Sequence, residues 1–356
     1  SPAFSKSLWQ GGSARSPFFK QVSYICRMKV VIPMAGTGKH LRPHTYSQPK
    51  PLIPIAGKPL IRHIVDNLVQ AGFTEYVFIL GYLGEKARHY LQSTYGESLT
   101  LHFVQQEPRL GLAHAIWVCK ALIENDPAIL IVLGDTLLQL DWQDFTRNGV
   151  SRLATSRVEN PALFGIAEVE PDSRIRRLVE KPAIPRSNFA LAGAYYIQQP
   201  ARLLAAIQHL LDHHLLSHGE YQLTDALQRL IEEGQPFYAY PVEHWLDCER
   251  KEALLEANRL LLRTEAVEDF PTYPDTVIIP PVYIPPSCKL HRAIIGPYVT
   301  LGEGADIQNA IIQDSIVGSY TRIRHILLRS SIIGGEVSIQ GHETQLNLGD
   351  HTDIEL

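Results

Sequence analysis

The C-terminal part of the chain repeats a pattern with a step of five or six residues. Each step carries one apolar residue, and a glycine often follows it. The apolar positions are Ile284, Leu290, Ile295, Leu301, Ile307, Ile312, Val317, Ile323, Leu328, Ile333 and Ile339. Three such steps make one coil of a parallel β-helix, and each coil buries its inward residue only by stacking on the next coil. The repeat therefore predicts a short β-helical prism, which assembles subunits or shapes a domain junction rather than catalysing.

Ahead of this repeat, the apolar pattern alternates between strand and helix from Met28 onward. We expect strands at 29–33, 76–80, 101–104 and 129–133, and helices at 60–71, 85–91, 113–123 and 250–263. Strands that alternate with helices imply right-handed crossovers and a mainly parallel sheet covered on both faces. The predicted fold class is therefore α/β, with ligands bound at the carboxyl ends of the strands.

Length and composition fit two folded domains. A chain of 356 residues, 45% of them hydrophobic, can bury a large core and usually splits at a linker. We expect an α/β domain over residues 28–264, a proline-rich linker over 265–282, the β-helix over 283–342 and a tail over 343–356. Residues 1–27 contain cations but no acidic residue, and we expect an unfolded extension there, from a mis-assigned start or added residues. An organelle transit peptide is the alternative.

Charge and cysteine content exclude several classes of function. A formal net charge of −4 and 20% charged residues give no overall positive field, so no nucleic acid partner is expected. No apolar run approaches the ~20 residues of a membrane span, so no membrane is expected either. The 4 cysteines include no C-x-x-C pair, which fits neither a disulfide scaffold nor a zinc site. A cytoplasmic location is the default expectation.

The first predicted strand turns at once into a segment that suits an anion. It ends in the sequence Ala35-Gly36-Thr37-Gly38, where glycines accept the left-handed conformations of a tight turn and let the backbone approach a ligand. Successive backbone N–H groups in such a turn can point at one phosphate. The cationic side chains that follow are Lys39, His40, Arg42 and Lys50. The segment therefore predicts a phosphate-binding loop, and the alternative is a basic surface loop.

Two common phosphate loops do not fit this segment. A nucleoside-triphosphatase P-loop needs a glycine five residues before its Gly-Lys pair and a Ser or Thr after the lysine, but Pro33 and His40 stand there. A dinucleotide-binding fingerprint needs a third glycine where Leu41 stands. A nicotinamide dehydrogenase is therefore disfavoured.

Two aspartates follow apolar strands further along the chain. Asp135 comes just after the strand at 129–133, and Asp247 ends the sequence Trp245-Leu246-Asp247. A carboxylate at the end of a buried strand must pair with a cation or a metal, or lie at the open edge of the sheet. Magnesium binds a few carboxylates plus substrate phosphate oxygens, so the two aspartates are candidate Mg²⁺ ligands. The alternative for Asp135 is a turn or helix-capping residue.

The glycine loop resembles the signature of the sugar-1-phosphate nucleotidyltransferases, which runs glycine-x-glycine-threonine-arginine-leucine-x-proline and later proline-lysine-proline-leucine. The matching residues are Gly36, Gly38, Leu41, Pro43, Pro49, Lys50, Pro51 and Leu52. The chain departs from the signature at Lys39, where the family has threonine, and at His40, where the family has its catalytic arginine. Cys248 and Glu249 likewise replace the last two residues of the family segment tryptophan-x-aspartate-threonine-glycine.

A second segment resembles the base-binding part of the same family. Residues 111–115 read Gly-Leu-Ala-His-Ala, as in glucose-1-phosphate thymidylyltransferases. In those enzymes a glutamine at the place of Gln106 and a glycine at the place of Gly111 contact the base. The glycine also begins a predicted helix, whose first N–H groups are unpaired.

The sugar-binding motifs of the family have counterparts as well. Gly165, Glu180 and Lys181 match motifs in which the glycine and the glutamate hold sugar hydroxyls and the lysine holds the sugar phosphate. The strand that contains Gly193 and Tyr195 matches the strand that lines the sugar pocket.

Together, these motifs resemble most closely the long glucose-1-phosphate thymidylyltransferases. The resemblance implies a Rossmann-like domain followed by a left-handed β-helix, and nucleotidyl transfer from dTTP or UTP to a hexose-1-phosphate, with glucose-1-phosphate favoured. It also implies Mg²⁺ as cofactor and a homo-oligomer. The candidate site residues are Lys39, His40, Arg42 and Lys50 for catalysis, Ala35, Gly36, Gly38, Gln106 and Gly111 for the nucleotide, Gly165, Glu180, Lys181, Gly193 and Tyr195 for the sugar phosphate, and Asp135 and Asp247 for the metal.

Two alternatives remain open. One is a catalytically weak or inactive sensing or assembly subunit of the same fold, which His40 supports and the retained Lys50, Asp135, Lys181 and Asp247 oppose. The other is an acyltransferase that works through the β-helix, although no acyl-donor site is evident. The base is also open, because thymidine and uridine differ by one methyl group, which a pocket discriminates only modestly.

Overall fold

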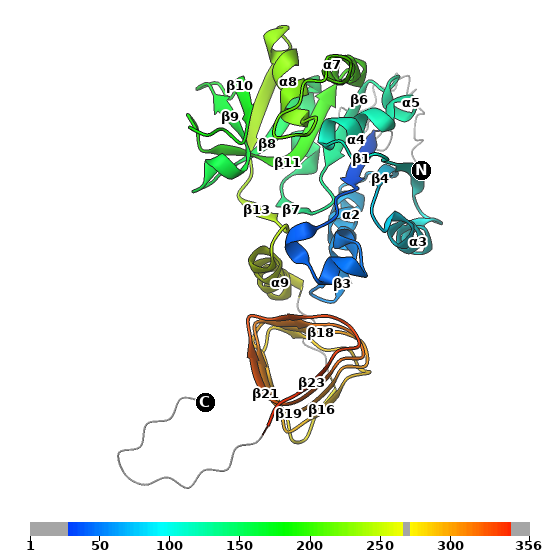
Figure 1. Cartoon of the computed structure of the whole chain (residues 1–356), viewed down its shortest axis with the longest axis vertical. Helices are drawn as coiled ribbons and strands as arrows, with labels where there is room; N and C mark the ends of the chain where they lie inside the picture. Colours follow the sequence, from blue (N-terminus) through cyan, green and yellow to red (C-terminus); the bar gives the residue numbers. More distant parts are fainter. Residues whose placement is uncertain (1–27, 266–270, 343–356) are drawn as a thin grey trace, which may run out of the picture.

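The computed structural model describes residues 28–265 and 271–342 (Figure 1). The predictions for residues 1–27 and 343–356, and for part of the linker, lie outside these residues. A layered α/β domain stands on a triangular prism, and helix α9 (Lys251–Glu265) lies between them. No helix in the described residues is long and apolar enough to cross a membrane.

A nine-stranded, mainly parallel sheet forms the centre of the α/β domain. Its parallel half consists, in spatial order, of β5 (Thr100–Gln105), β4 (Glu75–Leu80), β1 (Lys29–Met34) and β6 (Ala128–Val132). β11 (Phe189–Gln198) pairs antiparallel with β6. It joins this half to β8 (Ser151–Arg157), β9 (Gly165–Val169), β10 (Ile175–Glu180) and β12 (Phe237–Pro241). The Rossmann-like sheet is therefore as predicted.

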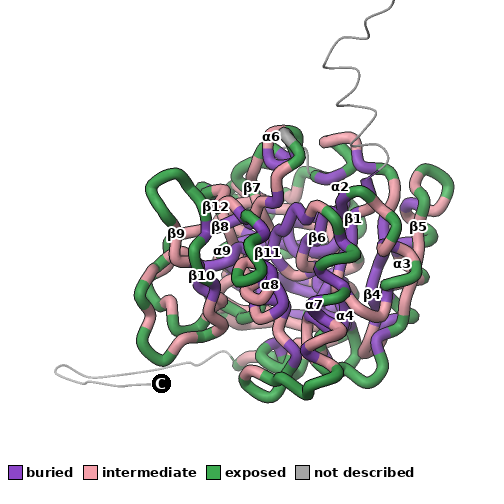
Figure 2. Tube along the Cα trace, turned by 90° about the horizontal axis from the view of Figure 1, so that it is seen from above, coloured by how far each residue is buried: buried purple, intermediate pink, exposed green. Residues whose placement is uncertain are grey.

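Helices cover both faces of the sheet because the buried residues of each strand alternate between two cores. Val30 and Ile32 of β1 belong to one core and Val31 to the other. The helices on the first face are α2 (Leu60–Gln70), α3 (Gly84–Tyr95), α6 (Trp142–Phe145) and α9, and those on the second are α4 (Leu112–Val118), α5 (Lys120–Ile123), α7 (Pro200–Asp212) and α8 (Leu223–Glu232). Figure 2 shows the buried strands between these layers.

One predicted helix is interrupted. The pattern at 113–123 predicts a continuous helix, but α4 ends and α5 begins at Cys119. The Cys119 backbone, at φ −96° and ψ 15°, leaves the helical region, and its N–H donates to Ile116 O instead of to the carbonyl four residues earlier. Neither Gly nor Pro marks this break in the sequence.

Short elements connect the layers to the strand ends. Two ribbons stand apart from the main sheet: β2 (Pro54–Ile55) with β3 (Lys58–Pro59), and β7 (Thr136–Gln139) with β13 (His244–Asp247). The 3-10 turns are η1 (Lys39–Leu41), η2 (His44–Tyr46), η3 (Lys50–Leu52), η4 (Arg147–Gly149) and η5 (Pro161–Leu163).

The C-terminal prism is the predicted left-handed β-helix, and its strand pairs are all parallel. Its strands are β14 (Val277–Ile278), β15 (Val282–Tyr283), β16 (Lys289–His291), β17 (Ile294–Ile295), β18 (Val299–Leu301), β19 (Asp306–Gln313), β20 (Ser315–Val317), β21 (Arg322–Arg329), β22 (Ile332–Ile333) and β23 (Ser338–Gln340). Lys289 pairs with Asp306 and Asp306 with Arg322, so each coil takes 16 or 17 residues, as three steps of five or six require.

The inward positions of the repeat are buried in the first coils. Those from Ile284 to Ile323 are buried, whereas Leu328, Ile333 and Ile339 in the last coil are partly buried because the described chain adds no further coil beyond them. β14 lies inside the stretch predicted as a linker and β15 begins at its last residue, so the first coil begins before residue 283.

Candidate active site

The glycine loop makes a tight turn directly after β1. Gly38 has φ +61°, and a Cβ there would lie 2.8 Å from Thr45 Cγ2, so this position requires glycine. The Thr45 hydroxyl donates to Gly38 O at 2.8 Å and holds the turn closed. Gly36 faces open space, since a Cβ there would meet nothing within 4 Å. The backbone from Ala35 to Gly38 is therefore open to a ligand at Gly36 and rigid at Gly38.

The structure divides the four predicted cations into two groups. Lys50 is buried at 6% exposure, and its Nζ lies 2.7 Å from Asp135 Oδ2. Lys39, His40 and Arg42 are exposed, and none of them is among the residues that line the cavity described below. The Arg42 guanidinium stacks over the Tyr46 ring at 5.0 Å.

His40 meets a residue that the sequence analysis did not assign to the site. Its Nε2 lies 3.7 Å from Glu249 Oε1, and both side chains are about half exposed. His40 comes from η1, and Glu249 comes from the turn between β13 and α9, so the contact spans the mouth of the site.

Strand pairing brings the two aspartates together. β7 and β13 pair antiparallel with Asp247 opposite Thr136, the neighbour of Asp135. The N–H of Cys248 donates to Asp135 O at 3.0 Å and fixes the end of this ribbon. The two carboxylates therefore lie side by side at the carboxyl end of β6.

The pKa values of Asp247 and Lys50 depend on each other's charge and on that of Asp135. Burial, and then the negative charge of Asp135, raise the pKa of Asp247 to about 7, against the opposing effect of Lys50. Burial by itself would lower the pKa of Lys50, but Asp135, Asp247 and Glu249 raise that pKa above its usual value. Lys50 is thus held as a buried cation, and Asp247 keeps its proton to a higher pH than an ordinary carboxyl unless a further cation is present.

A cavity of about 230 Å³ adjoins the aspartates. The predicted residues that line it are Asp135, Gly165, Glu180, Lys181, Gly193, Tyr195 and Asp247. Gly193 has φ +85° at a register shift between β11 and β8, which brings its backbone close to Thr136. Burial raises the pKa of Tyr195, and the charges of Glu180 and Asp135 add to this effect, so its hydroxyl stays protonated.

Gln106, Gly111 and His114 of the base segment form a cluster beside this cavity, and Leu112 of the same segment lines the cavity. Gln106 is 4% exposed, and its Nε2 donates to Gly111 O at 2.9 Å and lies 3.2 Å from His114 Nδ1. Burial lowers the pKa of His114, which favours the neutral ring that can accept this bond. Gly111 has φ +112°, and a Cβ there would lie 2.5 Å from Tyr221 O. The local geometry therefore fixes the amide of Gln106.

Sequence reasoning missed three contributions to the cavity. The Thr224 hydroxyl donates a hydrogen bond to Glu180 Oε2 at 2.6 Å. Phe164 and Trp245 contact each other edge to face at 5.0 Å and form an aromatic wall. Glu249 also lines the cavity. All of these residues lie within or next to sequence motifs of the family, and that position is the signal from which their place in the cavity could have been predicted.

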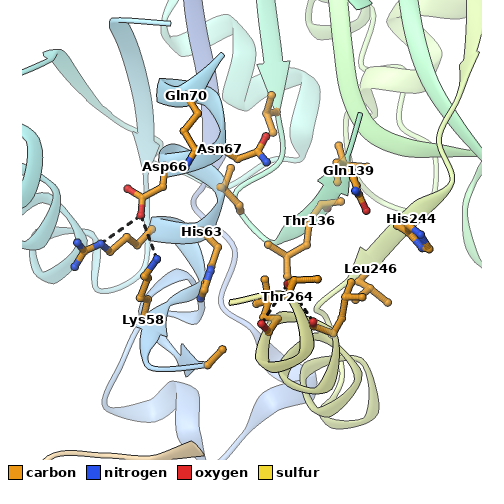
Figure 3. A pocket seen from close by; sticks show the side chains of 18 of the residues that line it. Lys58, His63, Asp66, Asn67, Gln70, Thr136, Gln139, His244, Leu246 and Thr264 are labelled. Atoms are coloured by element: carbon orange, nitrogen blue, oxygen red, sulfur yellow. Dashed lines mark hydrogen bonds and ion pairs between the residues drawn. The ribbon is translucent and has the colours of Figure 1, made fainter. Parts of the chain in front are cut away.

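A second cavity, of about 810 Å³, lies behind the ribbon that carries the aspartates (Figure 3). Its walls come from α2, the β7–β13 ribbon, α9 and the turn between β2 and β3. Asp66 on α2 pairs there with Lys58, as Figure 3 shows, and also with Arg62. Thr136 borders both cavities. Nothing in the sequence pattern predicted this space.

A family model described as Nucleotidyl transferase matches residues 29–264. The chain belongs to this family. Agl11 of Haloferax volcanii, a low-salt glycan biosynthesis nucleotidyltransferase, is 32% identical over 92% of this chain and 100% of its own length. A glucose-1-phosphate thymidylyltransferase of Streptomyces griseus is 27% identical over 92% of this chain and 99% of its own. A solved UDP-glucose pyrophosphorylase, complexed with UDP-glucose, is 25% identical, with a TM-score of 0.59 over 67% of this chain and 99% of its own.

These similarities confirm the predicted family and enzyme class, a sugar-1-phosphate nucleotidyltransferase that joins a nucleoside triphosphate to a sugar phosphate. They do not test the roles of single residues, which stay predictions.

Proposed function

We propose that this enzyme transfers the nucleotidyl group of dTTP or UTP to glucose-1-phosphate and releases pyrophosphate. The observation that carries the proposal is the cavity of about 230 Å³, because both aspartates and the candidate sugar-phosphate residues line it together. The relatives named as glucose-1-phosphate thymidylyltransferase and UDP-glucose pyrophosphorylase support the choice of sugar and of a pyrimidine nucleotide.

The reaction needs no side-chain nucleophile. The attacking phosphate of the sugar is already anionic near neutral pH, since its second pKa is about 6. The barrier lies in bringing two anions together and in the charge that develops on the departing pyrophosphate. We assign Lys50 to the triphosphate, Lys181 to the sugar phosphate, and the N–H groups of Gly36 and Gly38 to phosphate oxygens. The raised pKa of Lys50 keeps it charged for this role.

We assign Asp135 and Asp247 to Mg²⁺, and their chemistry fits a divalent cation. Two neighbouring carboxylates, one of which has a pKa raised to about 7, carry a repulsion that such a cation relieves. Within the described ranges, no group of three or more His, Cys, Asp or Glu residues is arranged as a metal site. Magnesium commonly takes only one or two carboxylates and completes its shell with water and substrate phosphates. When bound, it would neutralise charge on the phosphates.

The amide of Gln106 supports a pyrimidine base with an N3–H donor. Both of its assigned contacts use Nε2, which leaves Oε1 as the acceptor. Thymine and uracil offer a donor at N3, whereas cytosine has an acceptor at that ring position. A base without this donor would leave a buried acceptor unpaired, which is costly.

A second candidate is a catalytically weak or inactive subunit of the same fold. The contact between His40 and Glu249 favours it, because His40 stands where the family motif has arginine and is paired here with an acidic residue that stands where the motif has glycine. The pairing of Lys50 with Asp135 opposes it, because this part of the site is intact.

Pyrophosphate release from each common nucleoside triphosphate, measured with glucose-1-phosphate and with other sugar phosphates, tests the proposal. We expect turnover to be fastest with dTTP or UTP and glucose-1-phosphate, and to require Mg²⁺. A preference for ATP or CTP would overturn the assignment of Gln106, and a preference for GTP, whose base also has a ring N–H donor, would overturn the choice of a pyrimidine. No turnover with any pair, in a protein that still binds nucleotide, would favour the second candidate.

A further inference from the structure

The β-helix shares a buried core with the segment that carries Lys50. Ile316 of β20 belongs to the same buried cluster as Leu52 and Ile55, and Ile332 of β22 packs on this cluster. Figure 1 shows β3 and α9 directly above the upper face of the prism. The two domains therefore share one core at this junction.

The tip of the β2–β3 hairpin is held in a demanding conformation. Ala56 and Gly57 have φ +46° and φ +85°, and a left-handed backbone is uncommon for a residue with a side chain, such as Ala56. A Cβ on Gly57 would lie 2.4 Å from the ring of Tyr283, so the tip fits tightly against the first coil of the β-helix.

One buried side chain joins the hairpin, α9 and the β-helix. Asn258 of α9 is 0% exposed, and its Oδ1 accepts hydrogen bonds from Ala56 N at 2.9 Å and from Thr300 Oγ1 at 2.6 Å. Its Nδ2 donates to Tyr298 O at 3.2 Å. The amide thus pairs a strained backbone N–H of the hairpin with two groups of the β-helix.

We propose that Asn258 is a positioning residue for Lys50, and that the β-helix is thereby part of the catalytic unit. The chain between the hairpin and Lys50 is short and internally bonded: Ile53 N donates to Lys50 O at 3.1 Å, and Leu60 N donates to Ile53 O at 3.0 Å. Movement of the hairpin tip is therefore transmitted to Lys50 and to its 2.7 Å contact with Asp135. The catalytic part of this inference rests on the proposed function, in which Lys50 binds the triphosphate.

The test compares Asn258→Ala with Arg259→Met. The first variant leaves Ala56 N–H without its buried acceptor and frees the hairpin tip. The second removes the ion pair of Arg259 with Asp314, at 2.5 and 2.6 Å, which also links α9 to the β-helix but does not contact the hairpin. Both variants are made in the full chain, and two quantities are measured: the rate at which acetic anhydride labels Lys50, by peptide mass spectrometry, and kcat and KM for each substrate.

In Asn258→Ala, acetic anhydride should label Lys50 at least roughly threefold faster than in the parent, because local opening of the segment exposes the Lys50 amine. It should also lose about 10- to 100-fold in kcat/KM for the nucleotide, since a small displacement of a catalytic group has effects of this size. Arg259→Met should match the parent in both respects. The labelling readout does not depend on activity, so it stands even if the proposed substrates are wrong.

Labelling of Lys50 at the parent rate in Asn258→Ala would overturn the inference, as would equal acceleration in Arg259→Met. If Asn258→Ala does not fold, the variant Thr300→Val is measured instead. It removes the hydrogen bond that the β-helix donates to Asn258 Oδ1, and valine keeps the shape of the threonine side chain. Faster labelling of Lys50 in that variant supports the inference, and labelling at the parent rate overturns it.

Discussion

Replacing Asp247 with Asn should stabilise the metal-free protein and abolish turnover. In the parent, burial and the charge of Asp135 raise the pKa of Asp247 from 3.8 to about 7. This difference of about 3 units corresponds to about 4 kcal/mol of unfavourable free energy for the ionised carboxylate in the folded state, at about 1.4 kcal/mol per unit. Relaxation and water entry around the charge reduce this value, and we expect Asp247→Asn to gain roughly 2 kcal/mol at pH 8.

The sign of the pH dependence follows from proton linkage. A carboxyl whose folded pKa is raised binds its proton more tightly in the folded than in the unfolded state. The parent therefore loses stability as the pH rises from about 4 to about 7, and the loss persists above pH 7. The amide of the variant does not titrate. The advantage of Asp247→Asn should consequently be larger at pH 8 than at pH 5.

Urea unfolding in the presence of a chelator measures this difference, and repeating it with added Mg²⁺ tests the metal assignment. The ion should stabilise the parent by mass action and the variant little. Asp135→Asn is the matched comparison and should have the opposite sign without metal, because it leaves Lys50 buried without its 2.7 Å partner. A variant Asp247→Asn that is less stable than the parent at pH 8 would refute the burial argument. Equal stabilisation of both proteins by Mg²⁺ would refute the metal assignment.

Three further predictions concern the mouth of the site and the junction. His40→Arg should raise turnover at least about tenfold at pH 8, and Lys39→Ala should lower it, because one well-placed hydrogen-bond donor changes the rate by a factor of ~10² to 10³. An unchanged rate in His40→Arg would show that this position does not carry the chemistry. Deletion of residues 271–356 should cause aggregation or a change in oligomeric mass, measured by light scattering, because Ile316 is part of the shared core; a soluble, fully active protein of unchanged mass would count against this. Arg259→Met should cost about 1 kcal/mol at neutral pH. The ion pair with Arg259 lowers the pKa of the carboxyl it contacts, so this contribution is present above pH ~4 and fades as the pH falls further; a cost that does not depend on pH would contradict this reading.

Local periodicity was sufficient to predict the layers of the fold. The strand at β1 and the inward positions of the repeat follow from patterns over neighbouring residues, because burial on one face requires a fixed period. The break at Cys119 escaped prediction, since neither Gly nor Pro marks it in the sequence. The link from Asn258 to Ala56 also escaped, because these residues are 202 positions apart and a polar pair leaves no trace in an apolar pattern.

The site was predictable to the extent that its residues lie in continuous motifs. Asp135 and Asp247 were expected together from the family resemblance, and the register of two short strands explains why they meet. The division of the cations into a buried Lys50 and an exposed group was not predictable, because spacing along a loop does not determine which side chain turns inward. The role of Thr224 depends on a hydrogen bond to Glu180 between distant segments.

The contact of His40 with Glu249 changes how the two departures from the family motif should be understood. Taken singly, a histidine in place of an arginine is expected to weaken the binding of a triphosphate, and so is a glutamate in place of a glycine. Their contact at 3.7 Å means that neither substitution acts alone. An arginine introduced at position 40 would find a carboxylate within reach, and part of its charge would be used on Glu249 instead of on the substrate. Glu249→Gly in the His40→Arg background should therefore raise kcat/KM for the nucleotide by more than the product of the two single effects. If the single effects simply multiply, the two residues act independently on the triphosphate, and the pair carries no coupling energy.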